Sequence, residues 1–86
     1  MTHYTTATKE ILKLWTPEQI RTVFETLRPC RAESLEIFQR TDRRIACGIM
    51  ERAGMNPRTY TRQTIGRIAN ELKEAAGLPR HNSIAE

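Results

Sequence analysis

Residues 42–54 of the chain read DRRIACGIMERAG, a pattern typical of an amphipathic helix. Apolar residues recur three and four positions apart, which places them on one face, and Gly54 supplies the left-handed residue that commonly follows a helix end. Gly48 costs this helix some stability, although such a glycine often permits the close approach of another backbone. We therefore predict a helix from Asp42 to Ala53. Its inward positions are Ile45, Ala46, Ile49, Met50 and Ala53.

A turn and a second helix are predicted directly after this segment. Residues 55–57 form the expected turn, and the helix should begin between Pro57 and Thr61. Its end is marked by residues 77–79, where a glycine cap, an apolar contact back onto the helix and a proline stop follow one another. The predicted inward positions are Ile65, Ile68, Ala69, Leu72 and Ala76.

The first helix of the chain is predicted to begin near Thr5 or Thr6, because either threonine can act as an N-cap. Its apolar residues follow helical spacing and end at a tryptophan. The predicted inward stripe is Ala7, Ile11, Leu14 and Trp15.

The next helix has a clear start signal. Thr16 and Gln19 form a capping box, and Pro17 suits the first helical position. The helix should run from Pro17 to about Arg28, where Pro29 stops it by removing an amide donor. Its inward stripe is predicted to be Ile20, Val23, Phe24 and Leu27.

Residues 31–40 predict a further short helix, which carries Leu35, Ile37 and Phe38. Thr41 and Asp42 resemble a new N-cap, so we predict a break there. A continuous helix through Arg44 fits the helix propensities nearly as well. The chain is therefore predicted to be all-α: a compact bundle of four to five short helices with a helix-turn-helix-like pair in its C-terminal half.

Size and composition exclude several classes of protein. An 86-residue chain with 38% hydrophobic residues forms one small domain, here residues 1–86 with frayed ends at 1–5 and 80–86. The longest apolar run is residues 45–50, far below the roughly 18 to 20 residues that a membrane span needs. The chain shows no secretory signal pattern, so we expect a cytoplasmic protein.

Two cysteines occur, Cys30 and Cys47. They are too few and too far apart for a disulfide scaffold or a paired-cysteine zinc site, and we expect reduced thiols. His3 and His81 lie in the expected frayed ends without neighbouring ligands. No phosphate-binding glycine loop occurs, and no cofactor or metal is predicted. Tyr60 stands among arginines, but no general acid, metal or pocket is indicated beside it, so we predict that the protein is not an enzyme.

The positive charge is concentrated in the middle of the chain. Residues 28–67 contain nine Arg against four carboxylates, a local balance of +5 within a net charge of +4. Eleven of the 14 basic residues are Arg, whose guanidinium fork binds phosphate or a guanine edge in two-point contacts. This distribution indicates an acidic partner, although arginines that only solvate helix faces would give the same composition.

The predicted helix pair resembles a helix-turn-helix in general form, without matching a specific family. In such a motif the first helix supports a second helix that enters the major groove of DNA. Thr64, rather than Ile65, falls where a buried aliphatic residue is usual, so the register departs from the ideal pattern. We accordingly expect a DNA-binding regulator of transcription that binds double-stranded DNA.

The expected DNA contacts fall into three groups. Amide and guanidinium groups one turn apart on the last helix are the types that read base edges, whereas residues near the helix start and on the preceding helix suit phosphate. The base-reading candidates are Gln63, Arg67 and Asn70. The candidates near the helix start are Arg58, Thr59, Tyr60 and Arg62. The clamp expected from the preceding helix consists of Arg43, Arg44 and Arg52.

An alternative class remains open at this point. A small inhibitor or adaptor of the phage or plasmid type, such as an inhibitor of a host defence complex, would dock its Arg-rich face on an acidic protein partner. A homodimer is expected for a DNA binder of this size, because one reading helix contacts few base pairs. Leu12 lies off the first inward stripe and would otherwise be exposed, so the first helix is the predicted dimer element.

Overall fold

The computed structural model describes residues 3–27 and 35–78. Predictions that fall on residues 28–34 and 79–86, including the proline stop at Pro29, the state of Cys30 and the C-terminal tail, lie outside the described residues. Within these two ranges the chain forms four α-helices and one 3₁₀ helix and contains no strand. The all-α class is confirmed. The elements are α1 (Thr6–Leu14), α2 (Pro17–Leu27), α3 (Leu35–Arg52), η1 (Pro57–Thr59) and α4 (Arg62–Ala75).

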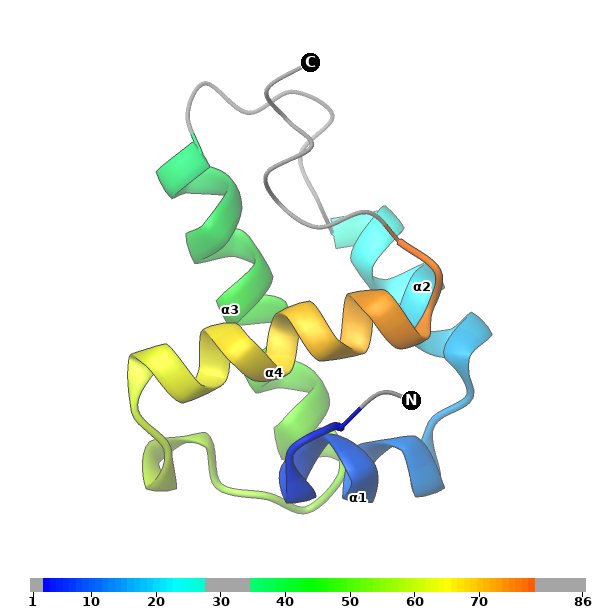
Figure 1. Cartoon of the computed structure of the whole chain (residues 1–86). Coiled ribbons are helices and arrows are strands. Elements are labelled where there is room, and N and C mark those ends of the chain that lie inside the picture. Colours follow the sequence, from blue (N-terminus) through cyan, green and yellow to red (C-terminus); the bar gives the residue numbers. More distant parts are fainter. Residues whose placement is uncertain (1–2, 28–34, 79–86) are drawn as a thin grey trace.

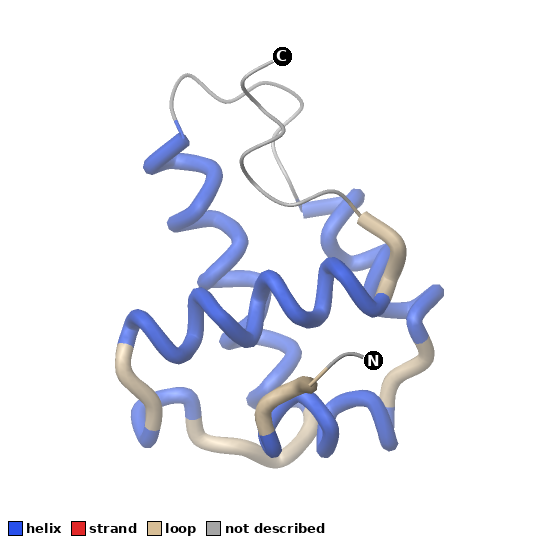
Figure 2. The backbone as a smooth tube through the Cα atoms, in the orientation of Figure 1, coloured by secondary structure: helices blue, strands red, loops and turns tan. Residues whose placement is uncertain are grey.

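Helix α4 is the central element of the globule. It crosses in front of α3, with α1 below it and α2 beside its C-terminal end (Figure 1), and it packs against all three helices. The tube view shows the same arrangement, with a short loop joining α1 to α2 and a longer connection, which contains η1, joining α3 to α4 (Figure 2). Contacts with the other three α-helices therefore fix the orientation of α4 and of the charged and polar face that it presents to solvent.

Apolar side chains from all four helices form one core. Its fully buried members include Ile11 of α1, Phe24 of α2, Met50 of α3 and Leu72 of α4. Burying a side chain of this size stabilises the fold by about 1.5 to 3 kcal/mol each. The inward residues predicted for α3 and α4 are confirmed as buried or half-buried members of this core.

The inward stripe predicted for α1 is partly wrong. Leu14 is 65% exposed, whereas Leu12 packs against the core. The buried face is rotated toward Thr8, whose hydroxyl donates to Glu71 Oε1 at 2.6 Å and so satisfies a buried polar group. Leu12 is therefore not the exposed dimer element that the sequence predicted.

The predicted start of α2 is confirmed atom by atom. The Thr16 amide donates to Gln19 Oε1 at 2.9 Å, and the Gln19 amide donates to Thr16 Oγ1 at 3.1 Å, which is a capping box. Leu27 departs from the prediction, because it is 60% exposed in the last turn.

The predicted break at Thr41 is wrong, since α3 continues through it. The Thr41 hydroxyl donates to the carbonyl oxygen of Ile37 at 2.9 Å, a bond that a threonine inside a helix makes with the preceding turn. Asp42 is buried against α4 instead of capping a new helix. The side chains of Leu35 and Phe38 lie outside the described residues.

The connection between α3 and α4 is longer than the predicted turn. Gly54 adopts φ +82°, as predicted, and the Met55 amide donates to the Met50 carbonyl oxygen at 2.9 Å. The chain then forms η1, and α4 begins at Arg62 after the N-cap Thr61, one residue beyond the predicted range. Residues 53–61 thus join two packed helices, where a helix-turn-helix has a turn of three or four residues.

The last turn of α4 ends as predicted. Gly77 has φ +76°, and the Leu78 amide donates to the Lys73 carbonyl oxygen at 2.8 Å. Leu78 packs against the core. In the described part of the chain, no helix is both long enough and apolar enough to span a bilayer.

Candidate nucleic-acid interface

An open groove of about 660 Å³ runs between α3 and α4. It brings together five of the residues predicted to contact DNA, which come from the two helices. These residues are Arg43, Arg62, Gln63, Arg67 and Asn70. Below, this hollow is called the polar groove.

Helical geometry explains why these side chains converge. On α4, residues three and four positions apart share a face, and the face that lines the polar groove follows the order Arg62, Gly66, Asn70. Gly66 has no side chain, and a Cβ built there would lie 3.8 Å from Cδ of Arg43. The stem of Arg43 therefore lies across α4 at Gly66, which holds its guanidinium group in the same groove as those of α4.

Two of the three guanidinium groups in the polar groove have no intramolecular ion pair within residues 3–27 and 35–78. Arg67 pairs with Glu71, Nε to Oε2 at 3.1 Å, while Arg43 and Arg62 make no such contact. Two of the three basic side chains of α1 and α2 are paired. Lys13 lies 3.3 Å from Glu10 and Arg21 lies 3.5 Å from Glu25, as expected for charges that solvate a helix surface.

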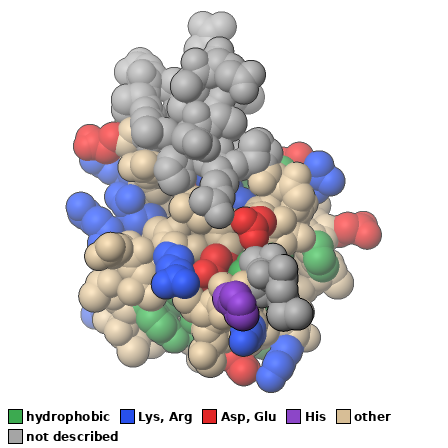
Figure 3. All heavy atoms as spheres, viewed as in Figure 1, with side chains coloured by type: hydrophobic (Ala, Val, Ile, Leu, Met, Phe, Trp, Pro, Cys, Tyr) green, Lys and Arg blue, Asp and Glu red, His purple; other side chains and the backbone are tan. Residues whose placement is uncertain are grey.

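The C-terminal half of the polar groove is acidic. Its lining includes Glu71 and Glu74 of α4. On the face shown in Figure 3, basic side chains gather on the left, over α3 and the beginning of α4, and acidic side chains lie near the centre and at both edges. Phosphate is favoured at the N-terminal end of α4, where the helix dipole is positive, and is repelled at the other end.

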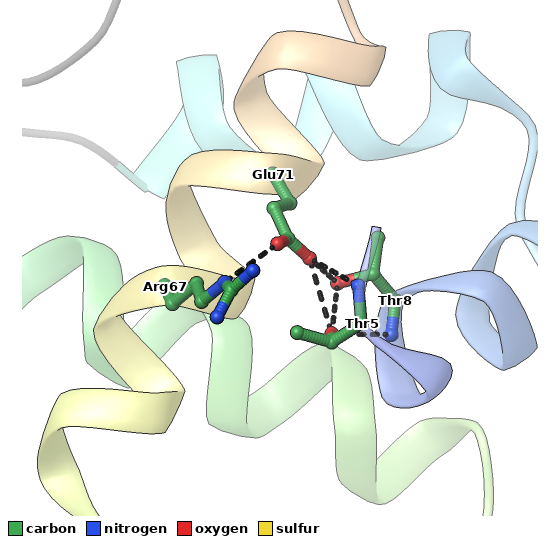
Figure 4. A network of polar contacts seen from close by, with 4 residues as sticks. All are labelled: Thr5, Thr8, Arg67 and Glu71. Carbon is green, nitrogen blue, oxygen red and sulfur yellow. Dashed lines mark hydrogen bonds and ion pairs between the residues drawn. The ribbon is translucent and has the colours of Figure 1, made fainter. Parts of the chain in front are cut away.

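Glu71 is fixed by four hydrogen bonds (Figure 4). Its Oε1 accepts from the Thr8 hydroxyl at 2.6 Å and from the amide and hydroxyl of Thr5 at 3.0 and 3.1 Å, and its Oε2 accepts from Arg67. Burial raises the pKa of this carboxyl, but the bonds from Thr8, Thr5 and Arg67 outweigh burial and hold the pKa below its usual value. Glu71 therefore attaches the start of α1 to α4 and orients Arg67.

A buried ion pair lies beneath the polar groove. Lys73 Nζ donates to Asp42 Oδ2 at 2.6 Å, and the two side chains are 0% and 3% exposed. A buried pair of this kind is costly to break, because removal of one partner leaves a charge in the apolar interior. The pair joins α3 to α4 and so fixes the position of the two helices that form the walls of the polar groove.

The remaining predicted residues lie elsewhere. Arg44 and Arg52 line a second groove, between α2 and α3. They project from a different side of α3 than Arg43 does. Arg58 and Thr59 are exposed on η1, and Tyr60 is half-buried against the core instead of lying on α4. The clamp predicted from three arginines of one helix is thus divided between two grooves.

Sequence reasoning missed several residues of the polar groove. Among them, His3 and Tyr4 were missed because residues 1–5 were assigned to a frayed end. The threonine N-cap of α1 was the signal that could have placed these residues, because Thr5 both caps the helix and donates to Glu71.

Cys47 is a free, half-buried thiol of α3 whose pKa is raised by burial and by Glu51. Among the described residues, no three His, Cys, Asp or Glu side chains are grouped to hold a metal.

No protein-family model, curated protein or solved structure matches this chain. Fold and groove together define a small all-α protein whose solvent-facing central helix carries guanidinium and amide groups. Its function must therefore be inferred from the chemistry of these side chains.

Proposed function

We propose that the protein binds double-stranded DNA through the N-terminal half of α4 and through Arg43, as a regulator of transcription would. The observation that carries this proposal is the convergence of three guanidinium groups with the amides of Gln63 and Asn70 in the polar groove. Guanidinium groups bind phosphate and guanine edges, and carboxamides suit adenine edges.

The division of charge along α4 suggests how DNA would lie on this surface. Arg62 and Gln63 are exposed in the first turn of α4, and Arg67 follows one turn later, whereas the carboxylates come after them. A reading helix commonly contacts base edges with its N-terminal residues. The duplex is therefore expected to approach the beginning of α4, with Arg43 binding backbone phosphate from the neighbouring helix.

Binding of labelled random-sequence duplex DNA across a salt series tests this proposal. Each phosphate contact that is lost lowers the slope of log affinity against log salt by about 1, so Arg43→Ala/Arg62→Ala should flatten the slope by about 2 and weaken binding at least tenfold. Lys9→Ala/Lys13→Ala is the control, because it removes the same charge from exposed positions of α1 that do not line the polar groove.

Two results would contradict the proposal. The first is absence of duplex binding at low salt, which would assign the arginine-rich surface to an acidic protein partner instead. The second is an equal loss of affinity in the lysine control, which would mean that only net charge matters.

A further inference from the structure

Arg67 is held differently from the other two arginines of the polar groove. Its Nε donates to Glu71 Oε2 at 3.1 Å, whereas Arg43 and Arg62 have no ion pair within residues 3–27 and 35–78. The side chain of Arg67 is nevertheless 67% exposed, so a molecule that enters the groove can reach its guanidinium group. Arg67 is therefore both oriented by a partner and accessible from solvent.

The pair of Arg67 and Glu71 is not an ordinary surface ion pair. In the pair of Arg21 and Glu25, which has the same spacing on α2, both side chains are more than half exposed, so neither fixes the other. Glu71 is only 12% exposed, and its other oxygen accepts three hydrogen bonds from two threonines at the start of α1 (Figure 4). Arg67 is thus bonded to a carboxylate that is itself held in place.

This contact leaves most of the donors of Arg67 available. A guanidinium group carries five N–H donors in a rigid plane, and Glu71 accepts from the one at Nε. The four donors on the two Nη atoms make no hydrogen bond within the described residues. Two donors of such a fork match the N7 and O6 acceptors of guanine in the major groove of DNA.

The place of Arg67 on α4 suits a contact with a base. It follows Gln63 by one turn in the N-terminal half of the helix, and both line the polar groove. A side chain that is oriented before binding loses less freedom when it binds, and a base without the matching acceptors would leave its donors unpaired. An oriented fork therefore discriminates between bases more strongly than a mobile one.

We propose that Arg67, positioned by Glu71, selects a guanine base in the duplex, while Arg43 and Arg62 bind phosphate without regard to sequence. Glu71 is then a positioning residue, because it acts on DNA only through Arg67. This inference rests on the proposed binding of double-stranded DNA and adds to it the base that the protein selects.

Two matched alanine variants separate base selection from phosphate binding, since both remove one exposed arginine of α4. Sequencing of the duplexes retained from a random pool measures selection, and a salt series measures phosphate contacts. Arg67→Ala should lower the preference for guanine at one position by about tenfold and leave the salt slope unchanged. Arg62→Ala should flatten the slope by about 1 and select the same sequences as the original chain.

A modified base tests the contact itself. 7-Deazaguanine lacks the N7 acceptor, so its presence at the selected position should weaken binding of the original chain. The same exchange should leave the affinity of Arg67→Ala unchanged, because the contact is already absent in that variant.

Glu71→Gln tests the positioning role. The change makes the net charge more positive, so binding to the random pool should tighten, while the preference for guanine should weaken because Arg67 is no longer fixed. Glu74→Gln is the matched control, since it removes the same charge from the same groove; it should tighten binding and keep the preference. Circular dichroism at the binding temperature checks that both variants keep the helix content of the original chain.

The outcomes distinguish this inference from the proposed function. Duplex binding without a preference for guanine, or with a preference that Arg67→Ala retains, would overturn the inference alone. An equal loss of preference in Glu71→Gln and Glu74→Gln would overturn the positioning role, because charge rather than the placement of Arg67 would then decide selection. Absence of duplex binding at low salt would overturn the proposed function and this inference with it.

Discussion

Arg43 and Arg44 are neighbours in the sequence but lie in different grooves. The polar groove beside α4 contains carboxylates, amides and a buried ion pair at its base, while the groove between α2 and α3 has exposed leucine and isoleucine and no carboxylate among the described residues that line it. Below, this second groove is called the apolar groove, and its apolar walls are Val23, Leu27, Ile37, Ile45 and Ile49. Successive residues of a helix point about 100° apart, so one helix can serve two surfaces of opposite chemistry. A run of basic residues in a sequence is therefore not one binding site.

The two grooves also differ in how their side chains are held. In the polar groove, Glu71 is fixed by four hydrogen bonds and Asp42 by a buried ammonium group, so the walls are rigid. In the apolar groove, Leu27 and Ile37 are exposed. The first arrangement is built to position charge, whereas the second leaves apolar side chains exposed to solvent.

The largest effect is expected from breaking the buried pair beneath the polar groove. Lys73→Met leaves the carboxylate of Asp42 buried without its ammonium partner, so the free energy of unfolding should fall by about 3 to 5 kcal/mol, a large part of a small domain's stability. Urea titration measures this change. The double variant Asp42→Leu/Lys73→Met should recover most of the loss, and a single variant within 1 kcal/mol of the original would contradict the assigned role.

A smaller effect is expected at Glu71. Glu71→Gln keeps the shape but removes the charge that accepts bonds from Thr5, Thr8 and Arg67, and should cost about 1 to 3 kcal/mol at neutral pH. Because the pKa of Glu71 is lowered by folding, its contribution is complete above the ordinary glutamate value of about 4.5 and is lost as the pH falls through the lower folded value.

Unfolding measured from pH 7 to pH 3 checks this sign. The difference in stability between the original chain and Glu71→Gln should be constant at neutral pH and narrow below about pH 4.5. A difference that widens with acidification would mean that Glu71 is not held as a carboxylate by its partners.

The smallest effect is expected in the apolar groove. Gly48→Ala adds a methyl group that meets nothing within 4 Å and should raise the free energy of unfolding by about 0.5 to 1 kcal/mol. Thermal unfolding measures this change. Gly54→Ala is the contrasting control and should destabilise the chain, because Gly54 has φ +82°. A loss of stability in Gly48→Ala would show that the fold requires a glycine at this position.

The fold was largely predictable because capping and periodicity are local. Short sequence patterns predicted three features that the structure contains. They are the capping box of Thr16 and Gln19, the left-handed conformation of Gly54 and Gly77, and the inward residues of α4. The break at Thr41 was wrong because a threonine hydroxyl can cap a helix or bond to the preceding turn, and long-range packing of Asp42 decides between these.

The candidate site was less predictable, since it depends on tertiary packing. The spacing on α4 indicated that Gln63, Arg67 and Asn70 share a face, and the structure places them in one groove with Arg43. Helical spacing alone turns Arg43 and Arg44 about 100° apart, but which groove each enters depends on whether α4 or α2 packs beside that face of α3. Glu71 was missed for the same reason, as its threonine donors lie 63 and 66 residues away.

The most direct test of the central claim, that only the polar groove binds DNA, compares Arg43→Ala with Arg44→Ala on a duplex of about one helical turn, which offers room for a single copy. The two variants remove the same charge from adjacent positions of α3. Arg43→Ala should flatten the salt dependence of binding by about 1 unit of slope, while Arg44→Ala should leave slope and affinity unchanged. Equal losses in the two variants, or a loss confined to Arg44→Ala, would contradict the assignment of DNA to the groove between α3 and α4.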